Sequence, residues 1–453
     1  RNAFFVVGEG LFIFFSVIIA SWLLIGHDFI IKDHTLMFKT LLISVVCQLF
    51  LYYNDLYDLN VTNTYQELFI RLLQALGASA IFLAIVYFLF PCCIVGRGIF
   101  IVSICFVIAF IVLWRVGYTY VLNRGLFDQK IVLLGSGELA GNIAKEINDS
   151  RDCGYRIAAI VNGQNSDERR FAGVSARICK NGYDGLCKEA KSLNINKIVV
   201  AIEERRTGFP IRQLLQCRVD GIEVIEGTSF YEMLTGKLIV EKINPSWLIF
   251  SEGFRKSRMR RVIKRTGDLL LSILMLVLLA PVLIAVAILI KLDSRGPVFF
   301  SQERVGENRR PYMVHKFRSM VQDAEKQSGP VWAQSNDSRV TRVGKFIRKW
   351  RIDEFPQLFN VIKGEMSFVG PRPEREFFVE ELEETIPYYG ERFSVKPGVT
   401  GWAQVSYPYG ASVEDAKEKL NYDLFYIKNM STFMDMMVVM RTVKTVLFGE
   451  GAR

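Results

Sequence analysis

Two adjacent acidic side chains, Asp353 and Glu354, lie in the stretch RIDEFPQLFNVIKGEMSFVGPRPE at residues 351–374. Neighbouring residues on an α-helix point about 100° apart, so the two carboxylates are not expected to bond to each other. They can divide two tasks, because one carboxylate can attack phosphorus while the other holds Mg²⁺. An isolated Asp-Glu pair usually just faces water, so the surrounding sequence decides whether this chemistry is expected.

Cationic side chains lie on both sides of the acidic pair. Arg372 is in the rigid turn GPRP, and its planar guanidinium is suited to gripping phosphate oxygens. Upstream, the stretch GPVFFSQERVGENRRPYMVHKFRSM places Arg304, Lys316 and Arg318 around short hydrophobic strands. Acidic and basic groups of this kind favour a site for phosphorylated substrates.

An amphipathic helix is predicted directly before the acidic pair. Its apolar face consists of Val340, Val343, Phe346, Ile347 and Trp350, and its basic face of Lys345, Arg348 and Lys349. Such a helix can lie in a membrane interface with its charges toward lipid phosphates. It can equally pack on the core of its own domain, and the spacing does not separate the two.

A long apolar segment, Leu269 to Ile290, precedes the chemistry-bearing region. Basic residues flank it on both sides, so the positive-inside rule puts both ends in the cytoplasm. Pro281 in its middle removes a backbone N–H and favours a break. We therefore predict a re-entrant membrane helix over residues 266–292, with a straight fifth span as the alternative.

Four apolar stretches of bilayer length come first in the chain. They cover about Phe4 to Ile25, Leu36 to Tyr53, Leu68 to Phe90 and Ile99 to Leu122. Arg115, Arg124 and Lys130 at the end of the fourth stretch predict that the following domain is cytoplasmic. Residues 1–125 are therefore expected to form a four-helix transmembrane domain, in which Glu9 is a packed or interfacial polar residue.

An α/β domain is predicted over residues 128–250, where short β-branched runs alternate with helical ones. Its first turn, Gly135-Ser136-Gly137, follows a strand and opens a helix, as in a dinucleotide-binding fold. The second strand ends at Asn162, where a bound NAD would call for Asp or Glu. We therefore expect a Rossmann-like regulatory or structural module that holds no NAD.

The composition fits a protein that is partly embedded in a membrane and has anionic partners. Of 453 residues 51% are hydrophobic, the mean hydropathy is +0.23 and the net charge is +10. The positive charge suits an anionic membrane surface or substrates such as sugar nucleotides and lipid phosphates. No basic helix or aromatic-basic sheet pattern favours nucleic acid. The eight cysteines include no C-x-x-C pair, so neither zinc nor thiol chemistry is expected.

The motifs KFRSM, RIDEFPQLFNVIKGEMSFVGPRPE and VKPGVTGWAQV, preceded by an apolar hairpin with a central proline, resemble the bacterial monotopic phosphoglycosyl transferases. These are also called polyprenyl-phosphate hexose-1-phosphate transferases. The resemblance runs from about Val262 to Arg453. The front half is similar to that of the large members, which start exopolysaccharide, capsule or O-antigen synthesis.

The resemblance implies an α+β catalytic domain at 262–453 that transfers a sugar 1-phosphate from a UDP-sugar to undecaprenyl phosphate and releases UMP. Asp353 would be the nucleophile of a covalent aspartyl intermediate, and Glu354, with Asp353, would bind Mg²⁺. Candidates for phosphate and substrate contacts are Arg372, Lys316, Arg318 and Arg304. The expected location is the bacterial inner membrane, with the catalytic domain facing the cytoplasm and the protein a homo-oligomer, a dimer.

Two departures from the family pattern concern the hairpin and the substrate contacts. The family often has Ser before the hairpin proline, where this chain has Ala280. After GWAQV many relatives continue with Asn-Gly-Arg or Ser-Gly-Arg, whereas this chain reads SYPYGAS. The turn and the contacts beyond GWAQV must therefore differ from the usual ones.

Two other functions compete with this interpretation. Tyr312 and Lys316 have the Y-x-x-x-K spacing of a membrane-tethered NAD-dependent epimerase or dehydratase. However, YMVHKF is typical of a strand and lies beyond the apolar hairpin rather than in the glycine-turn domain. The second alternative is a membrane scaffold without catalysis. Magnesium-dependent UMP release separates both from the transferase.

Overall fold

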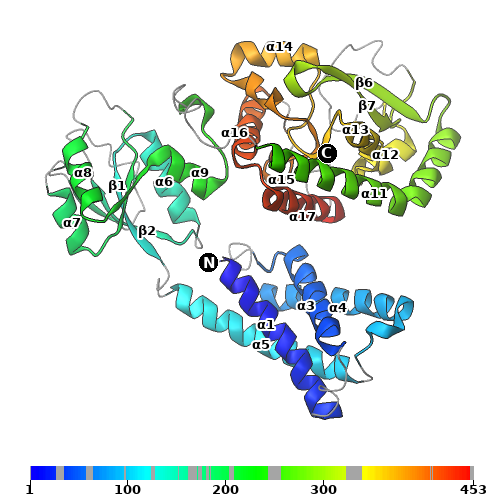
Figure 1. Ribbon diagram of the computed structural model, residues 1–453, viewed down its shortest axis with the longest axis horizontal. Helices are drawn as coiled ribbons and strands as arrows, with labels where there is room; N and C mark the ends of the chain where they lie inside the picture. The colour runs from blue at the N-terminus through cyan, green and yellow to red at the C-terminus, as the bar shows by residue number, and fades with distance from the viewer. Residues whose placement is uncertain are drawn as a thin grey trace. The chain divides into compact units, whose positions relative to one another are not determined.

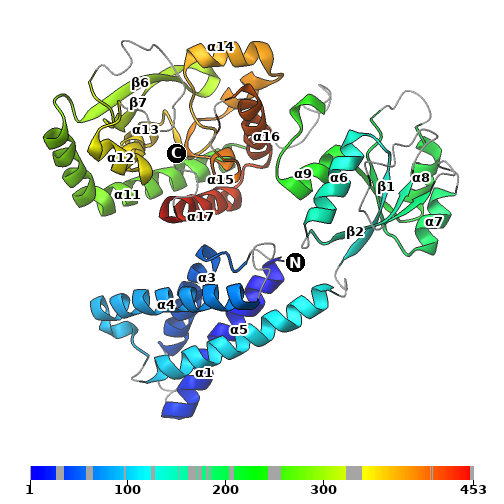
Figure 2. The ribbon, with the colours of Figure 1, turned by 180° about the vertical axis from the view of Figure 1, so that it is seen from behind.

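The computed structural model describes residues 2–26, 35–57, 65–95, 98–123, 128–150, 153–161, 171, 176–179, 183, 185–203, 209–242, 257–322, 339–408, 410 and 412–448. Asn162, the residue on which the prediction of no bound NAD rests, lies outside these residues. The chain divides into two compact units, Arg1–Gly227 and Thr228–Arg453. Figures 1 and 2 show the elements of each unit.

Four apolar helices open the first unit, as predicted. They are α1 (Asn2–Ile25), α3 (Leu36–Tyr53), α4 (Tyr65–Leu89) and α5 (Ile99–Asn123). Helix α1 packs on α5 and α3, and α3 packs on α4. With α11 below, five described helices are long and apolar enough to cross a bilayer. These helices indicate a membrane protein.

A buried ion pair joins α1 to α5. Arg115 Nε donates to Glu9 Oε1 at 2.8 Å, and Arg115 Nη1 donates to the carbonyl of Leu56 at 2.7 Å. Both charged side chains are buried. The topology prediction used Arg115 as a charge that flanks the membrane span. The structure shows instead that Arg115 is buried between the helices. It is the packing partner of Glu9, because an ionised group among apolar helices needs an opposite charge.

A parallel five-stranded sheet forms the centre of the middle domain, which confirms the α/β prediction. The strand order is β3-β2-β1-β4-β5. The strands are β1 (Gln129–Leu134), β2 (Tyr155–Val161), β3 (Arg177–Cys179), β4 (Lys197–Val200) and β5 (Glu223–Glu226), with helices α6 (Glu138–Asp149), α7 (Leu186–Ser192) and α8 (Ile211–Val219). Apolar side chains of α7 and α8 join β1 and β4 in one core cluster.

The glycine turn between β1 and α6 is occupied by the chain itself. Glu203, after β4, accepts a hydrogen bond from the Leu139 N–H at 2.9 Å. A Cβ at Gly137 would lie 2.8 Å from that carboxylate. The N-terminus of a helix attracts anions, and in dinucleotide folds the pyrophosphate lies there. Here a carboxylate of the protein already lies at this helix end.

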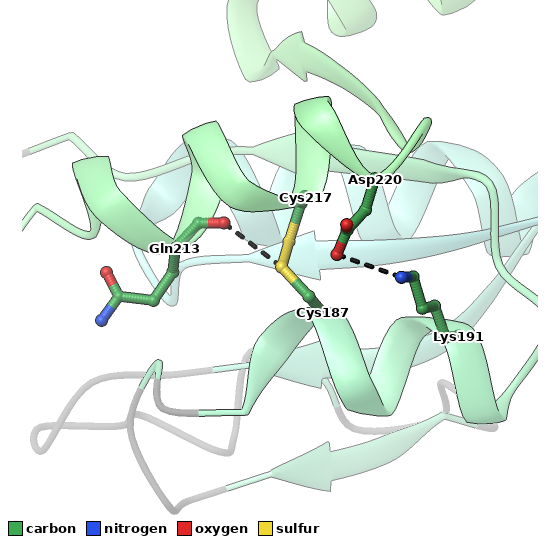
Figure 3. The surroundings of a disulfide bond; sticks show 5 residues. All are labelled: Cys187, Lys191, Gln213, Cys217 and Asp220. Atoms are coloured by element: carbon green, nitrogen blue, oxygen red, sulfur yellow. Dashed lines mark hydrogen bonds and ion pairs between the residues drawn. A yellow bond between two sulfur atoms is a disulfide. The ribbon is translucent and has the colours of Figure 1, made fainter.

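A disulfide joins Cys187 of α7 to Cys217 of α8, thirty residues apart (Figure 3). Lys191 and Asp220 form an ion pair between the same two helices at 3.1 Å. Disulfides are rare in the reducing cytoplasm, where this domain is expected. The cysteine spacing gave no sign of this pair, because the two thiols meet only when the helices pack side by side.

The second unit begins before the predicted catalytic boundary. Residues 228–242 include most of α9 (Gly227–Thr235) and pack on α16 (Val413–Asn429). Lys428 binds Glu232 at 2.7 Å, and the Leu238 N–H donates to the Asn421 carbonyl at 3.1 Å. The packing therefore changes at Gly227/Thr228, and not near residue 250, because Leu238 and Val240 are buried in the core of this unit.

Helix α11 spans Arg258–Asp293 and continues through Pro281. Figures 1 and 2 show that it changes direction along its length. The predicted break is therefore a bend within one helix, because proline removes only one N–H from the ladder. Exposed apolar side chains on this helix include Leu270, Leu274, Val277, Leu278 and Ile284.

Two small sheets and a set of helices complete the unit. Strands β6 (Phe299–Val305) and β7 (Pro311–Phe317) form an antiparallel hairpin, and β8 (Ser367–Val369) pairs in parallel with β9 (Gly398–Thr400). The remaining helices are α12 (Arg342–Lys349), α13 (Gln357–Lys363), α14 (Glu376–Thr385), α15 (Trp402–Ser406) and α17 (Thr432–Phe448). Helix α12 packs Ile347 in the core and leaves Phe346 exposed, so the predicted apolar face packs in part on the domain core, and the interpretation as a membrane-interface helix stays a prediction.

Candidate active site

The acidic pair lies on a tight turn and not at the end of an α-helix. Helix α12 ends at Lys349, and Arg351 adopts a left-handed conformation with φ of 52°. Residues Ile352–Glu354 then form a 3₁₀ turn, η5, in which the Glu354 N–H donates to the Arg351 carbonyl at 3.2 Å. A 3₁₀ turn has three residues per turn, so adjacent side chains point about 120° apart. The 3₁₀ geometry of η5 therefore points the side chains of Asp353 and Glu354 in different directions.

Glu354 is the point where three elements meet. It is buried, and its Oε1 accepts a hydrogen bond from Arg372 Nη2 at 2.7 Å and from Lys316 Nζ at 3.2 Å. Arg372 follows β8, and Lys316 is on β7. The structure thus brings together three predicted site residues that are far apart in the sequence.

The two carboxylates have opposite pKa shifts. Burial by itself would raise the pKa of Glu354, but Arg372, Lys316 and Arg351 hold it well below its ordinary value. Burial, and then the charge of Glu354, raise the pKa of Asp353 to about 6. Neighbouring acids whose pKa values are pushed apart are typical of acids with separate chemical tasks.

The acidic pair fits Mg²⁺ in its donor chemistry. Among the residues that the structure describes, no group of three or more His, Cys, Asp or Glu side chains could hold a metal. Magnesium commonly takes only one or two carboxylates and completes its shell with water and substrate phosphates. Glu354, kept ionised by its cationic neighbours, and Asp353 would be the protein ligands.

Arg304 lies at the loop that carries Arg372. Its Nη2 donates to Gln302 Oε1 at 2.7 Å, and its Nη1 donates to the Pro373 carbonyl at 3.3 Å. Nη1 also lies 3.6 Å from Glu374 Oε2. Arg304 therefore holds one side of the Pro-Arg-Pro turn. Its predicted contact with substrate phosphate stays a prediction.

Arg318 follows strand β7, and its side chain lies against the C-terminal end of helix α11. Its Nη2 donates to the carbonyl of Ser294 at 2.7 Å and to the hydroxyl at 2.8 Å. The guanidinium is buried, and the recorded bonds join it to α11 rather than to the acidic pair. The structure gives Arg318 the task of anchoring α11, and its expected contact with substrate stays a prediction.

Asn360 is a supporting residue that the sequence reasoning missed. It is fully buried on α13, where its Nδ2 donates to the Met313 carbonyl at 2.7 Å and its Oδ1 accepts from the His315 N–H at 3.1 Å. These bonds fix α13 against β7, the strand that carries Lys316. In the sequence LFNVIKG this asparagine lies between apolar residues, and that position could have indicated a buried polar residue.

Arg351 was also missed. Its charge contributes to the low pKa of Glu354, and burial lowers the pKa of Arg351 itself. Its position within three residues of Glu354 was a signal, but its left-handed backbone was not readable from residue type. Only Gly and, less often, Asn or Asp adopt that conformation routinely.

The chain is similar to known bacterial sugar transferases. The family model for bacterial sugar transferases matches residues 259–449. A UDP-N-acetylgalactosamine-undecaprenyl-phosphate N-acetylgalactosaminephosphotransferase of Aeromonas hydrophila is 44% identical over 242 residues, 53% of this chain and 56% of the relative. An undecaprenyl-phosphate glucose phosphotransferase of Komagataeibacter xylinus is 32% identical over 364 residues, 77% of this chain and 65% of the relative.

A third relative is also similar over most of the chain. The UDP-glucose:undecaprenyl-phosphate glucose-1-phosphate transferase of Escherichia coli (strain K12) is 31% identical over 335 residues, which is 73% of this chain and 70% of the relative. The chain thus spans less than two thirds of the lengths of the first two relatives and somewhat more of the third.

Proposed function

The chain belongs to the bacterial sugar transferase family of undecaprenyl-phosphate hexose phosphotransferases, and from that premise we propose that it transfers a sugar 1-phosphate from a UDP-sugar to undecaprenyl phosphate. UMP is the second product. The reaction is the first membrane step of exopolysaccharide, capsule or O-antigen synthesis. The observation that carries the proposal is the convergence of Arg372 and Lys316 on Glu354, next to Asp353.

The reaction runs in two phosphoryl transfers. An Asp353 carboxylate oxygen attacks the phosphorus that bears the sugar, a bond forms between that oxygen and phosphorus, and the bond to the bridging oxygen breaks. UMP leaves with the bridging oxygen. A phosphate oxygen of undecaprenyl phosphate then attacks the same phosphorus and releases the Asp353 carboxylate. The final product is undecaprenyl diphosphate sugar.

Charge and position account for most of the rate in phosphoryl transfer. Arg372, whose side chain is 35% exposed, can reach phosphate oxygens while it stays bonded to Glu354. Lys316 adds a second positive charge at the same carboxylate oxygen of Glu354. Magnesium bound by Glu354 and Asp353 would neutralise the diphosphate and stabilise the departing UMP.

Helix α11 would enter the bilayer and return to the same face. Near its start, Arg265 Nη2 donates to the Ile362 carbonyl at 2.8 Å, and at its end Asp293 accepts from the Val343 N–H at 3.0 Å. Both ends therefore bind the same unit, so both would lie on the same side of a membrane. A straight helix of 36 residues would be about 54 Å long, more than the roughly 30 Å of hydrocarbon. The bend lets its exposed apolar middle reach lipid from the cytoplasmic side of the inner membrane.

The covalent intermediate gives the direct test. Purified enzyme with UDP-sugar and magnesium, but without lipid, should become labelled with sugar phosphate and should exchange UMP back into UDP-sugar. Asp353→Asn keeps the shape but removes the anionic nucleophile, so labelling and exchange should both vanish. Asp415→Asn makes the same chemical change at the N-terminal cap of α16 and should leave both intact.

Two outcomes would reject the mechanism. Labelling that survives in Asp353→Asn would place the nucleophile elsewhere. Turnover that proceeds normally, with no labelling and no exchange before lipid is added, would favour direct attack by undecaprenyl phosphate with both acids only binding metal.

A further inference from the structure

Arg392 is a buried arginine that none of the steps above uses. It lies in the 3₁₀ segment η6 (Tyr389–Ser394), with 7% of its surface exposed. Its Nη2 donates to the main-chain carbonyl of Arg372 at 3.0 Å. The side chain of Arg372 in turn donates to Glu354. Arg392 is thus connected to the candidate active site through Arg372.

Arg392 is itself held by an ionised partner and a hydroxyl. Its Nη2 also donates to Asp423 Oδ2 at 2.9 Å, and its Nη1 donates to the Tyr389 hydroxyl. Asp423 belongs to α16 and is 2% exposed. A guanidinium bound by three groups on three segments has its planar fork fixed in one orientation. The position of the Arg372 carbonyl is thereby tied to the core of the unit.

Both carbonyls of the Arg372-Pro373 pair are bound by arginine side chains. Arg392 binds the carbonyl of Arg372, and Arg304 binds that of Pro373. The loop is also close-packed on β9, because a Cβ at Gly398 would lie 2.1 Å from the nitrogen of Gly370. A loop clamped in this way presents the Arg372 side chain in a defined direction.

We propose that Arg392, held by Asp423, is a positioning residue for the transfer reaction, and that it fixes the direction in which Arg372 reaches the substrate diphosphate. This inference rests on the proposed function and adds a residue that acts through Arg372. It requires the buried Arg392–Asp423 pair to matter for the rate of transfer as well as for folding. A purely structural pair would stabilise the unit without any special link to Arg372.

A double-mutant cycle separates the two roles. Arg392→Lys keeps the charge but cannot bridge Asp423, Tyr389 and the Arg372 carbonyl at once. A misplaced catalytic group can cost about 100-fold, so we expect kcat/KM for the UDP-sugar to fall by about 10- to 100-fold. In an Arg372→Ala background the same change should have little further effect, because the group that it positions is gone.

Lys428→Met is the matched control, since it removes the partner of buried Glu232 on the same helix as Asp423. Its effect should multiply with that of Arg372→Ala. If Arg392→Lys does not fold, Asp423→Asn takes its place in the cycle, because it removes the charge that holds Arg392 and keeps the side-chain size. Effects of Arg392→Lys or Asp423→Asn that simply multiply with Arg372→Ala would overturn the inference.

Hydrogen exchange provides a readout that needs no activity. The amides of residues 370–376 should exchange faster in Arg392→Lys than in wild type, and at the wild-type rate in Lys428→Met. Unchanged exchange in Arg392→Lys would also overturn the inference. If wild-type enzyme produced no UMP at all, the proposed function would fail, while the exchange experiment would still decide whether Arg392 holds the loop.

Discussion

Replacing Glu354 by Gln removes one negative charge from between two cations with almost no change in shape. Glu354 Oε1 lies 2.7 Å from Arg372 Nη2 and 3.2 Å from Lys316 Nζ. Hydrogen bonds to charged groups contribute about 1.5–3 kcal/mol each, and neutral ones about half as much. The Gln carbonyl can still accept these bonds, so each should be weakened and not lost.

The expected cost in stability follows from the exposure of the three side chains. Removing one partner of a fully buried ion pair costs about 3–5 kcal/mol. Lys316 and Arg372 retain 24% and 35% side-chain exposure, so water recovers part of that penalty. We expect Glu354→Gln to lower the free energy of unfolding by about 1–3 kcal/mol.

The expected cost in activity is larger than the cost in stability. Glu354 would supply a magnesium ligand and fix Arg372, so its neutralisation should lower the rate of UMP release by about 10²–10³-fold. The magnesium concentration for half-maximal rate should rise as well, because the site loses one anionic ligand. The assay is UMP release across a magnesium titration, with thermal unfolding measured on the same samples.

Glu232→Gln is a control of similar burial and partner number. Glu232 accepts from Lys428 at 2.7 Å and from Asn429 at 3.1 Å, away from the acidic pair. It should show a similar loss of stability with nearly normal turnover. The reasoning is refuted if Glu354→Gln keeps the wild-type rate and magnesium midpoint, or if both variants lose activity equally.

Three further predictions concern pH, topology and NAD. Because the pKa of Asp353 is raised to about 6, falling pH should protonate the nucleophile, so labelling without lipid should decline below about pH 6 at limiting magnesium; a profile flat to pH 5 would contradict this. Single cysteines at Ser257 and Ser294 in a cysteine-free chain should both resist an impermeant thiol reagent on intact cells, whereas labelling at Ser294 alone would indicate a spanning α11. Because Glu203 lies at the helix end where pyrophosphate would bind, turnover should need no NAD, and an absolute NAD requirement would revive the epimerase alternative.

Local sequence was enough to predict the main elements and to single out candidate site residues. The four apolar helices and the parallel α/β domain follow from hydrophobic period and length. The motif that holds Asp353, Glu354 and Arg372 was singled out by its residue types and by its resemblance to a known family. These properties depend on residues close together in the chain. For the same reason the sequence located the acidic pair and gave candidate cations, but could not say which cations touch it.

The tertiary structure decided the partners. Lys316 reaches Glu354 from β7, while Arg318, two residues later and beyond the end of that strand, anchors α11. Arg115 meets Glu9 across 106 residues, and Arg392 meets both Arg372 and Asp423. Buried charges must be paired, but the pairing depends on which helices and loops pack together. The sequence by itself thus determined the main helices and strands of this protein and its candidate site residues, and packing across long sequence distances determined which side chains hold the acidic pair in place.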